Sequence, residues 1–435
     1  MTTPRTLSML LTLMLIMATG ACATGGPDDD TNPTGGGGQL VSDADRLSPA
    51  EDAPVEAAVA GLRSFTGDYT EALASRQDTE AQPNTVYSPI SLGYAFAMLR
   101  AGATGDTAAQ LDDVFGFPEG VHEAYNALSA EILNTGEPPP REQVGATRDP
   151  DEPPEDPIVS IANGLFVQQG FEVGEPFLRA LAQHYGAGAR AVDFPSGEAV
   201  DIINRWVSEH TEERIEQLFE ELDPETVTVL ANAIYLKADW QAPFEEHRTE
   251  HEPFQLPDGD TTEVPMMHRE AAELGYATGD GWHAARLPYV GRELVMWVVV
   301  PTDRAVTAPP ITGELLSELA EAGTTMVELA MPRWDFASDV EVLPLLAELG
   351  VTDLAGLDGI GEAVEVSDAI HRATITVDEN GTEAAAVTGI AGAVSAPPPS
   401  EVSVRADRPF SFALTHEPTG APLFVGSVTD PTEED

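Results

Sequence analysis

Cysteine and basic residues are scarce in this sequence. Cys22 is the only cysteine among 435 residues, which excludes a disulfide bond within the chain. There are 74 acidic side chains against 21 basic ones, Lys237 is the single lysine, and the formal net charge is -53. This charge argues against nucleic acids, polyanionic polysaccharides and anionic lipid surfaces as partners, because each would be repelled. We expect a monomeric protein with a solvated acidic surface.

Long apolar runs are also lacking, except for one at the N-terminus. Arg5 precedes a run from Leu7 to Ala18, which is too short to span a bilayer and is typical of a secretory signal. We therefore predict a signal peptide over residues 1–21 and export of the protein.

Two cleavage sites fit the end of this run. Thr19 to Cys22 resemble a lipobox, with Thr19 where such motifs usually carry leucine. Cys22 would then be the acylated first residue of a bacterial lipoprotein at the outer membrane or cell surface, held there through its lipid. Cleavage after Ala23, at an A-x-A site, would instead release a secreted, extracellular protein. We favour the lipoprotein, because the segment that follows suits an anchored protein.

One large domain is expected after this segment. Residues 22–53 are acidic and glycine-rich and predict a flexible tether. Residues 54–435 predict a single domain, since 42% of the chain is hydrophobic and a sizeable core can be buried. An acidic, proline-rich loop insertion interrupts this domain at residues 134–158.

The apolar pattern predicts a mixture of helices and strands. Helical spacing predicts helices over residues 89–103, 106–117 and 199–222. Continuously apolar or β-branched runs predict buried strands over 226–240, 293–301 and 372–379, and two alternating runs predict a hairpin over 408–428. The fold class is therefore α+β.

One motif matches a zinc site. His247, Glu250 and His251 fit the H-x-x-E-H pattern, in which two histidines on one helix face bind zinc. Pro243 and Pro253 leave too little helix for a rigid site. We interpret the segment as a charged loop and expect no metal.

A serine hydrolase is the second enzymatic possibility. Ser88 or Ser91 could be a nucleophile with His371 as its base, but no G-x-S-x-G turn surrounds either serine. A helix-capping role is preferred for these serines. We therefore expect no enzyme, and nothing in the sequence indicates a cofactor.

A ribbon of small residues lies near the C-terminus. GTEAAAVTGIAGAVS, Gly381 to Ser395, has no proline, so every residue could donate a hydrogen bond to a sheet. Alanine and glycine hold a sheet poorly, so we expect a strand that can be inserted between two others without being compelled to be there. Prolines 397–399 mark where insertion must stop. The alternative is an alanine-rich linker.

The ribbon and its context resemble the serpins, a family of serine protease inhibitors. VDENGTEAAAVTG is similar to the hinge of a serpin reactive-centre loop, and the resemblance covers residues from about 54 to 431. The supporting stretches, in the expected order, are NTVYSPISLGYAFAMLRAGATGDTAAQL, IANGLFVQQGF, INRWVSEHTEERI, LANAIYLKADWQAPF, LPYVGRELVMWVVVP, ADRPFSFAL and PLFVGSV. The resemblance implies the serpin fold, with three β-sheets, about nine helices and an exposed reactive-centre loop, here residues 379–399.

The resemblance also implies a mechanism. A serine protease attacks a bait bond in the loop and forms an acyl-enzyme, and the freed loop then inserts into the main β-sheet and traps the protease. Inhibitory hinges need short side chains. The hinge residues here are Glu379, Gly381, Thr382, Glu383, Ala384, Ala385, Ala386 and Thr388. We expect an inhibitor. A non-inhibitory serpin that acts as a binding or structural surface lipoprotein is the alternative, and papain-like cysteine proteases are possible targets.

The family's usual loop length places the bait bond at Ser395-Ala396, with Val394-Ser395 as the next candidate. Small residues on both sides suit a protease with a shallow apolar pocket, elastase-like or subtilisin-like. The resemblance further places Ser88, Ser91, Asn232 and His371 in the serpin shutter, a buried polar cluster beneath the point where the sheet opens.

Overall fold

The computed structural model describes residues 38–40, 42–76, 83–133, 157–211, 213, 215–303, 307–362, 364, 366, 368–382 and 399–433. They belong to one folded unit that begins at Gly37. The signal peptide, Cys22 and most of the acidic insertion lie outside the described residues. So do hinge residues Glu383, Ala384, Ala385, Ala386 and Thr388 and the bait-bond candidates Val394, Ser395 and Ala396.

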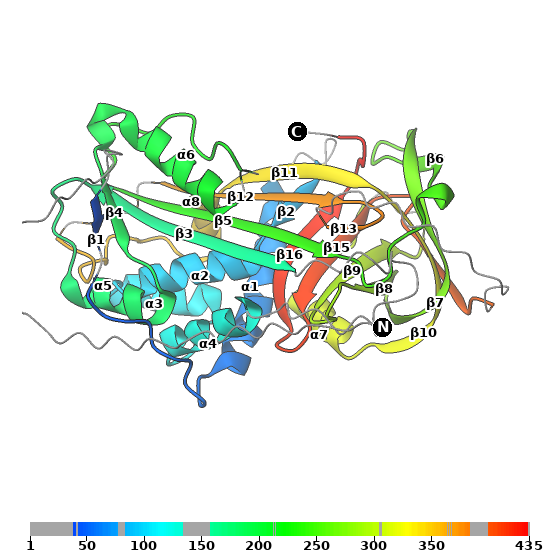
Figure 1. The fold of residues 1–435 in the computed structure, drawn as a ribbon, viewed down its shortest axis with the longest axis horizontal. Helices are drawn as coiled ribbons and strands as arrows, with labels where there is room; N and C mark the ends of the chain where they lie inside the picture. The colour runs from blue at the N-terminus through cyan, green and yellow to red at the C-terminus, as the bar shows by residue number, and fades with distance from the viewer. Residues whose placement is uncertain are drawn as a thin grey trace, which may run out of the picture. The chain divides into compact units, whose positions relative to one another are not determined.

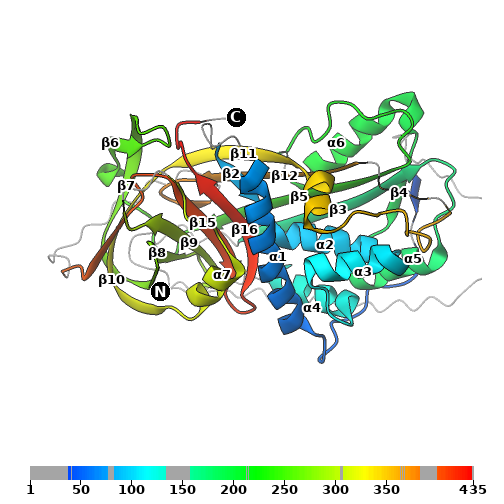
Figure 2. The same cartoon turned by 180° about the vertical axis from the view of Figure 1, so that it is seen from behind.

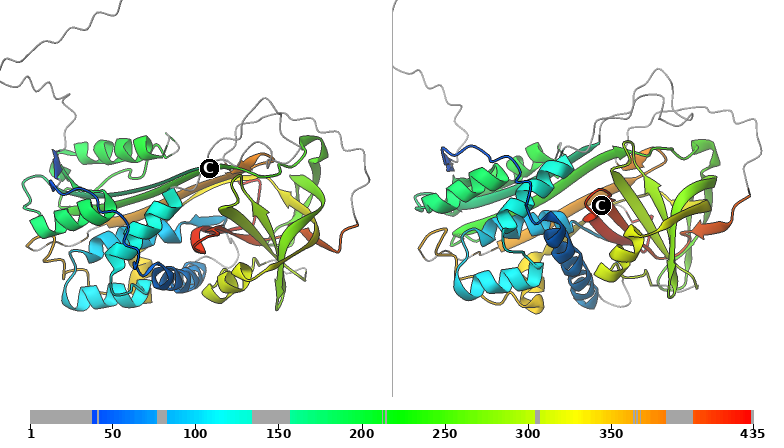
Figure 3. Two further views of the ribbon diagram at one scale, coloured as in Figure 1. Left: turned by 60° about the horizontal axis from the view of Figure 1, so that its bottom comes forward. Right: turned by 90° about the horizontal axis from the view of Figure 1, so that it is seen from below.

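One sheet forms the centre of this unit, and helices cover both of its faces (Figures 1 and 3). In spatial order its strands are β1 (Gly38–Leu40), β4 (Ala189–Val192), β3 (Ile158–Gln168), β5 (Thr228–Asp239), β13 (Gly381–Thr382), β12 (Asp368–Val377) and β11 (Trp334–Glu341). The largely apolar sequence of β5 follows from this position, since a strand covered on both faces needs no polar side.

Because side chains alternate along a strand, a strand of this sheet can contribute side chains to the cores on both faces. Leu165 and Val167 of β3 join the larger apolar core, whereas Phe166 between them joins a smaller core under α6. The helices are α1 (Val55–Arg76), α2 (Pro89–Arg100), α3 (Gly105–Phe115), α4 (Val121–Leu133), α5 (Glu175–Ala180), α6 (Glu198–His210), α7 (Gly313–Ala320) and α8 (Val342–Leu349). Helix α2 is buried on every side from Pro89 to Leu99, because it lies between the sheet and the other helices.

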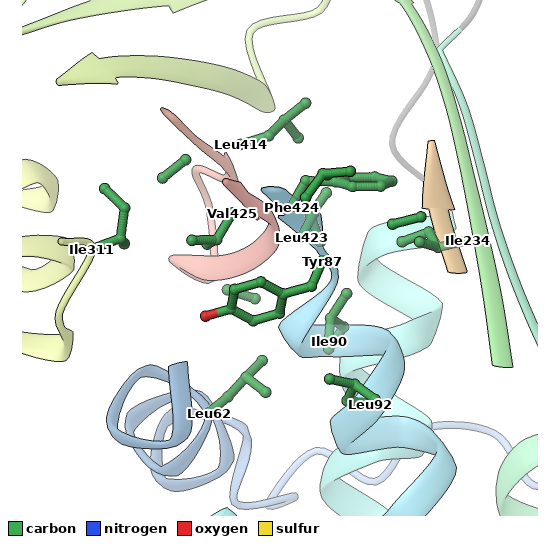
Figure 4. Packing of buried hydrophobic residues seen from close by; sticks show 14 of the residues in the cluster. Leu62, Tyr87, Ile90, Leu92, Ile234, Ile311, Leu414, Leu423, Phe424 and Val425 are labelled. Atoms are coloured by element: carbon green, nitrogen blue, oxygen red, sulfur yellow. The ribbon is translucent and has the colours of Figure 1, made fainter. Parts of the chain in front are cut away.

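Within the described residues the other strands form a second continuous ladder, so two ladders are present there where three sheets were expected. Its order is β14 (Val402–Arg405), β10 (Gly323–Pro332), β7 (Thr261–Gly279), β8 (Trp282–Pro288), β9 (Leu294–Pro301), β15 (Phe410–His416), β16 (Ala421–Val428) and β2 (Thr85–Tyr87), with β6 (Glu250–Gln255) paired to β7. The expected hairpin is β15 and β16. Helix α1 packs on β16 (Figure 2), and Leu62, Tyr87, Ile90 and Leu423 join helices and ladder in the core (Figure 4).

Two boundaries differ from the sequence-based expectation. Helix α6 ends at His210, so the helix predicted over residues 199–222 is wrong in its second half. The side chain of Asn204 accepts hydrogen bonds from the backbone N–H groups of Leu218 and Phe219, which holds this part of the chain back against α6. Ile215, Leu218 and Phe219 are buried there, and this tertiary packing overrides helical periodicity.

The second difference concerns the boundary between the predicted tether and the folded domain. Residues 38–40 pair with β4, Leu47 N donates to the carbonyl of Gln183, and Arg46 bonds to Asn126. Folded structure therefore begins near Gly37 rather than near Pro54. An edge strand offers free backbone groups to any sequence, so polar composition does not prevent this pairing.

Among the helices in the described ranges, none combines the length and apolarity needed to cross a lipid bilayer.

Candidate functional site

The two central strands of the first sheet separate at one end. β5 and β12 pair directly and in parallel from Val229 with Asp368 to Ile234 with Ala373. Beyond this stretch β13 lies between them: Gly381 pairs with Asp239, and Thr382 pairs with Ala238 on one side and Val377 on the other. The first two residues of the small-residue ribbon therefore occupy a gap between the strands.

Only glycine fits the first of these positions. A Cβ built on Gly381 would lie 2.1 Å from the carbonyl oxygen of Ala238 and 2.8 Å from the Cα of Asp239. Both are backbone atoms of β5 and cannot rotate away. Glycine is required at this position by the close approach of the β5 backbone, and not by an unusual φ angle.

A tight turn delivers the chain into the gap. The Asp378 carboxylate accepts hydrogen bonds from the N–H groups of Asn380, at 2.7 Å, and Gly381, at 3.1 Å. Burial raises the pKa of Asp378, and these two bonds oppose the rise. Trp240 holds the same turn through two hydrogen bonds. Its indole N–H donates to the Asp378 carbonyl at 3.0 Å, and its backbone N–H donates to the Asn380 carbonyl at 2.7 Å.

Glu379 fixes the outer side of the turn. Its carboxylate is 3% exposed and accepts hydrogen bonds from the Thr249 hydroxyl and from Arg333, the latter at 2.5 Å. Its carbonyl accepts from the N–H of Phe244 at 2.8 Å. A buried carboxylate is tolerated here because it is paired and hydrogen-bonded.

The four polar residues predicted as a shutter lie together under the line where β5 and β12 still pair. Ser88 caps α2, and its hydroxyl accepts from the N–H of Ser91 at 3.2 Å. Asn232 of β5 donates to the carbonyl of Ser91 at 2.8 Å and to its hydroxyl at 2.6 Å. His371 of β12 stands opposite Asn232 in the register and bonds to its side-chain oxygen.

The partners of His371 fix its tautomer. Nε2 accepts a hydrogen bond of 2.9 Å from the backbone N–H of Ser88, so the proton resides on Nδ1, which donates to Oδ1 of Asn232. Complete burial lowers the pKa of His371 to about 3. The ring is therefore neutral, and neither of its nitrogens contacts a serine hydroxyl, as a hydrolase base would have to do.

Asn163 is a fifth member of this cluster that the sequence analysis missed. It lies opposite Asn232 in the register of β3 with β5, and its side-chain oxygen accepts from Nδ2 of Asn232 at 2.5 Å. Asn163, Asn232 and His371 thus form a polar row across three adjacent strands. The available signal was an asparagine within a strand-like run, in IANGLF.

The H-x-x-E-H motif is a turn followed by a strand. His247 lies in a 3-10 turn, Glu246–Arg248, and Glu250 and His251 begin β6. Without a helix, the two histidines do not share a helix face, but the interpretation as a charged loop is wrong for Glu250 and His251, which belong to a strand.

Comparisons with known proteins agree with this geometry. Residues 60–431 match the family model described as serpin (serine protease inhibitor). A serpin-like protein of Thermococcus kodakarensis is 31% identical over 402 residues, covering 89% of this chain and 88% of the relative. The leukocyte elastase inhibitor of Bos taurus is 32% identical over 378 residues, covering 81% and 95%.

The chain belongs to the serpin family. Among solved serpins, native tengpin superposes with a TM-score of 0.76 at 24% identity, over 89% of this chain and 97% of tengpin. Human glycosylated kallistatin gives 0.73 at 25% identity, over 87% and 99%. The predicted fold class is confirmed, and the serpin is not an enzyme, as expected.

The predicted site residues divide into three groups. The structure brings Ser88, Ser91, Asn232 and His371 together, and it places Glu379, Gly381 and Thr382 at the gap. Residues 383–398 of the predicted loop lie outside the described residues. What these residues do in a working serpin stays a prediction.

Proposed function

We propose that this serpin is a suicide-substrate inhibitor of serine proteases. The target cleaves the loop and is held as an acyl-enzyme, with its catalytic serine esterified to the new carboxyl end of the loop. The segment that follows Thr382 then inserts between β5 and β12 before water hydrolyses the ester. The protease is carried along and loses its active geometry.

The observation that carries this proposal is the position of β13. Because β5 and β12 are parallel to each other, a chain that turns back at Asp378 runs antiparallel to both. Gly381 and Thr382 already make such pairs. Further insertion only continues this pattern, provided that the six residue pairs from Val229 with Asp368 onward separate.

Insertion is energetically favourable by a simple estimate. About fifteen inserted residues at roughly 3.3 Å each give a strand near 50 Å. A dozen or so new ladder hydrogen bonds, at about 1 kcal/mol net each, exceed the few kcal/mol that hold an enzyme loop in place.

We further propose a target that prefers small or apolar residues, elastase-like or subtilisin-like. Val394, Ser395 and Ala396 flank the proposed bait bonds, and small side chains fit a shallow specificity pocket. Relatives named alpha-1-antitrypsin 1-3, of Mus musculus, and leukocyte elastase inhibitor, of Bos taurus, support a protease target.

We propose that the protein acts as a monomer outside the cytoplasm and contacts a membrane only through a lipid on Cys22. In a bacterial host, metabolic labelling with a fatty acid should mark the wild type and not Cys22→Ala. If both proteins were labelled equally, or if the wild type were not labelled, a lipid on Cys22 would be refuted and only the secreted form would remain.

The mechanism is tested by incubation with a panel of elastase-like, subtilisin-like and papain-like proteases. We expect a band that survives denaturing electrophoresis at the summed mass of serpin and protease, and sequencing of the released C-terminal peptide locates the bait bond. Cleavage by every protease without such a band would favour the non-inhibitory serpin.

Thr382→Arg sharpens this test. Thr382 is 2% exposed between the strands, so an arginine there opposes insertion by burying a charge. We expect the variant to be cleaved without forming the covalent band. Thr261→Arg, at an exposed start of β7, is the matched control and should keep the band.

A further inference from the structure

A polar cavity of about 230 Å³ lies at the β1–β4 edge of the first sheet, at the end where α6 lies on one face and α5 on the other (Figure 1). Helices α2, α4 and α6 contribute Tyr94, Ser129 and His210 to its lining, and β3 contributes Asn163. No lining residue is aspartate or glutamate. The chain as a whole has 74 acidic side chains.

Two arginines line the same cavity. Arg46 donates from Nε to Asn126 at 3.1 Å and from one terminal nitrogen to the Ser129 hydroxyl at 2.8 Å, which leaves further N–H groups of the guanidinium. Arg190 lies with its guanidinium carbon 5.9 Å from the centre of the Trp206 ring. Within the described ranges, neither arginine forms an ion pair with a carboxylate.

Asn163, which lines the cavity, has a side-chain hydrogen-bond donor without a partner. Nδ2 of Asn163 is buried and bonds to no atom of the described chain, whereas its side-chain oxygen is used by Asn232. An unpaired buried donor costs free energy, which an oxygen acceptor placed in the cavity would recover.

We propose that this cavity binds a small oxyanion, a phosphate, a sulfate or a carboxylate. Arg46 and Arg190 supply charge and N–H donors suited to planar or tetrahedral oxygens, and Asn163 supplies a neutral donor. The absence of lining carboxylates removes the repulsion that an anion meets over most of a chain with a net charge of -53.

The site has a consequence for the sheet, which rests on the proposed function. An oxyanion bound to Nδ2 of Asn163 fixes that side chain, and through it Asn232, which His371 contacts across the line that must open. Bound anion therefore favours the closed sheet and slows insertion. Binding itself does not depend on inhibition.

Binding is measured by titration calorimetry and thermal unfolding of the full protein with sodium phosphate, sulfate and acetate. Ionic strength is held constant with sodium chloride, because screening alone stabilises so acidic a chain. We expect saturable heat and a rising unfolding midpoint. Comparison of the affinities for phosphate and sulfate with that for acetate distinguishes tetrahedral oxyanions from carboxylates as ligands.

Arg190→Gln should weaken binding at least ten-fold, whereas Arg205→Gln, an exposed arginine of α6 outside the cavity, should change it less than two-fold. If Arg190→Gln does not fold, Asn163→Asp provides the second variant, since it keeps the acceptor for Asn232 and repels an anion. No saturable heat with any of the three anions, or equal loss in the Arg190 and Arg205 variants, would overturn the site. A protein that binds phosphate but traps no protease would refute the proposed function alone.

Discussion

Tyr289 and Thr382 share a hydrogen bond of 2.5 Å between their hydroxyl oxygens, at the point where the small-residue ribbon enters the sheet. The Tyr289 ring stacks on Trp240, with centroids 4.3 Å apart and an interplanar angle of 16°. Trp240 in turn holds the backbone of Asp378 and Asn380. Side chains outside the ribbon therefore hold its first residues in the gap.

Tyr289→Phe should release this hold. The variant keeps the stacked ring and leaves the buried Thr382 hydroxyl without its partner, so we expect a free energy of unfolding lower by about 1 kcal/mol. Denaturant unfolding measures the change. Tyr125→Phe is the matched control, because the Tyr125 hydroxyl is buried without a hydrogen-bond partner in the described structure. An equal loss in both variants would contradict the account.

Gly381→Ala should expel the start of the ribbon from the gap. The new methyl would overlap the backbone of Ala238, and we expect a loss of about 1–3 kcal/mol in unfolding free energy. Gly323→Ala meets nothing within 4 Å of the added Cβ and should change stability by less than about 0.5 kcal/mol. The urea concentrations at the unfolding midpoints of the two variants, compared with the wild type, measure these changes. An unchanged Gly381→Ala midpoint would mean that β13 is not held as described.

The sequence allowed prediction of elements that carry their own local signal. The apolar run of β5, the Ser88 cap and the β15–β16 hairpin all follow from nearby residues. The resemblance to serpins placed the polar cluster. Asn163 was missed, because strand register depends on tertiary packing and the β3–β5 partners are far apart in sequence.

Long-range contacts also explain the wrong boundaries. Asn204 binds the backbone of Leu218 and Phe219, beyond the end of the helix that apolar periodicity had extended to residue 222. Residues 38–40 have a tether-like composition, yet they pair with the edge strand β4, and Leu40 packs against the apolar core. Neither contact has a signature in the local sequence.

Acid should weaken the closed sheet through His371. Its pKa is about 3 in the folded chain and about 6.5 when unfolded, so its contribution to stability is complete above pH 6.5. As pH falls below 6.5, the unfolded state gains a proton first and this contribution falls by about 1.4 kcal/mol per pH unit. Protonation of Nε2 would also oppose the Ser88 N–H with a second donor.

The test compares His371→Ala with wild type from pH 7 to pH 5. The variant should be less stable and more prone to spontaneous insertion or polymerisation at pH 7, and the stability gap should narrow by about 2 kcal/mol at pH 5. Changes in net charge affect both proteins and cancel. His251→Ala, which removes an exposed histidine, is the control for the general effect of losing an imidazole. A gap independent of pH for His371→Ala, or unchanged heat stability and monomer content, would refute this role.

The central claim is that the ribbon, once cut, is more stable as a strand between β5 and β12 than outside the sheet. The direct measurement is the thermal unfolding midpoint before and after cleavage within residues 390–397 by a metalloprotease, which forms no acyl-enzyme. We predict that the midpoint rises by about 15 °C, from a dozen hydrogen bonds of about 1 kcal/mol in a domain of this size. An unchanged midpoint in a fully cleaved sample would contradict the account.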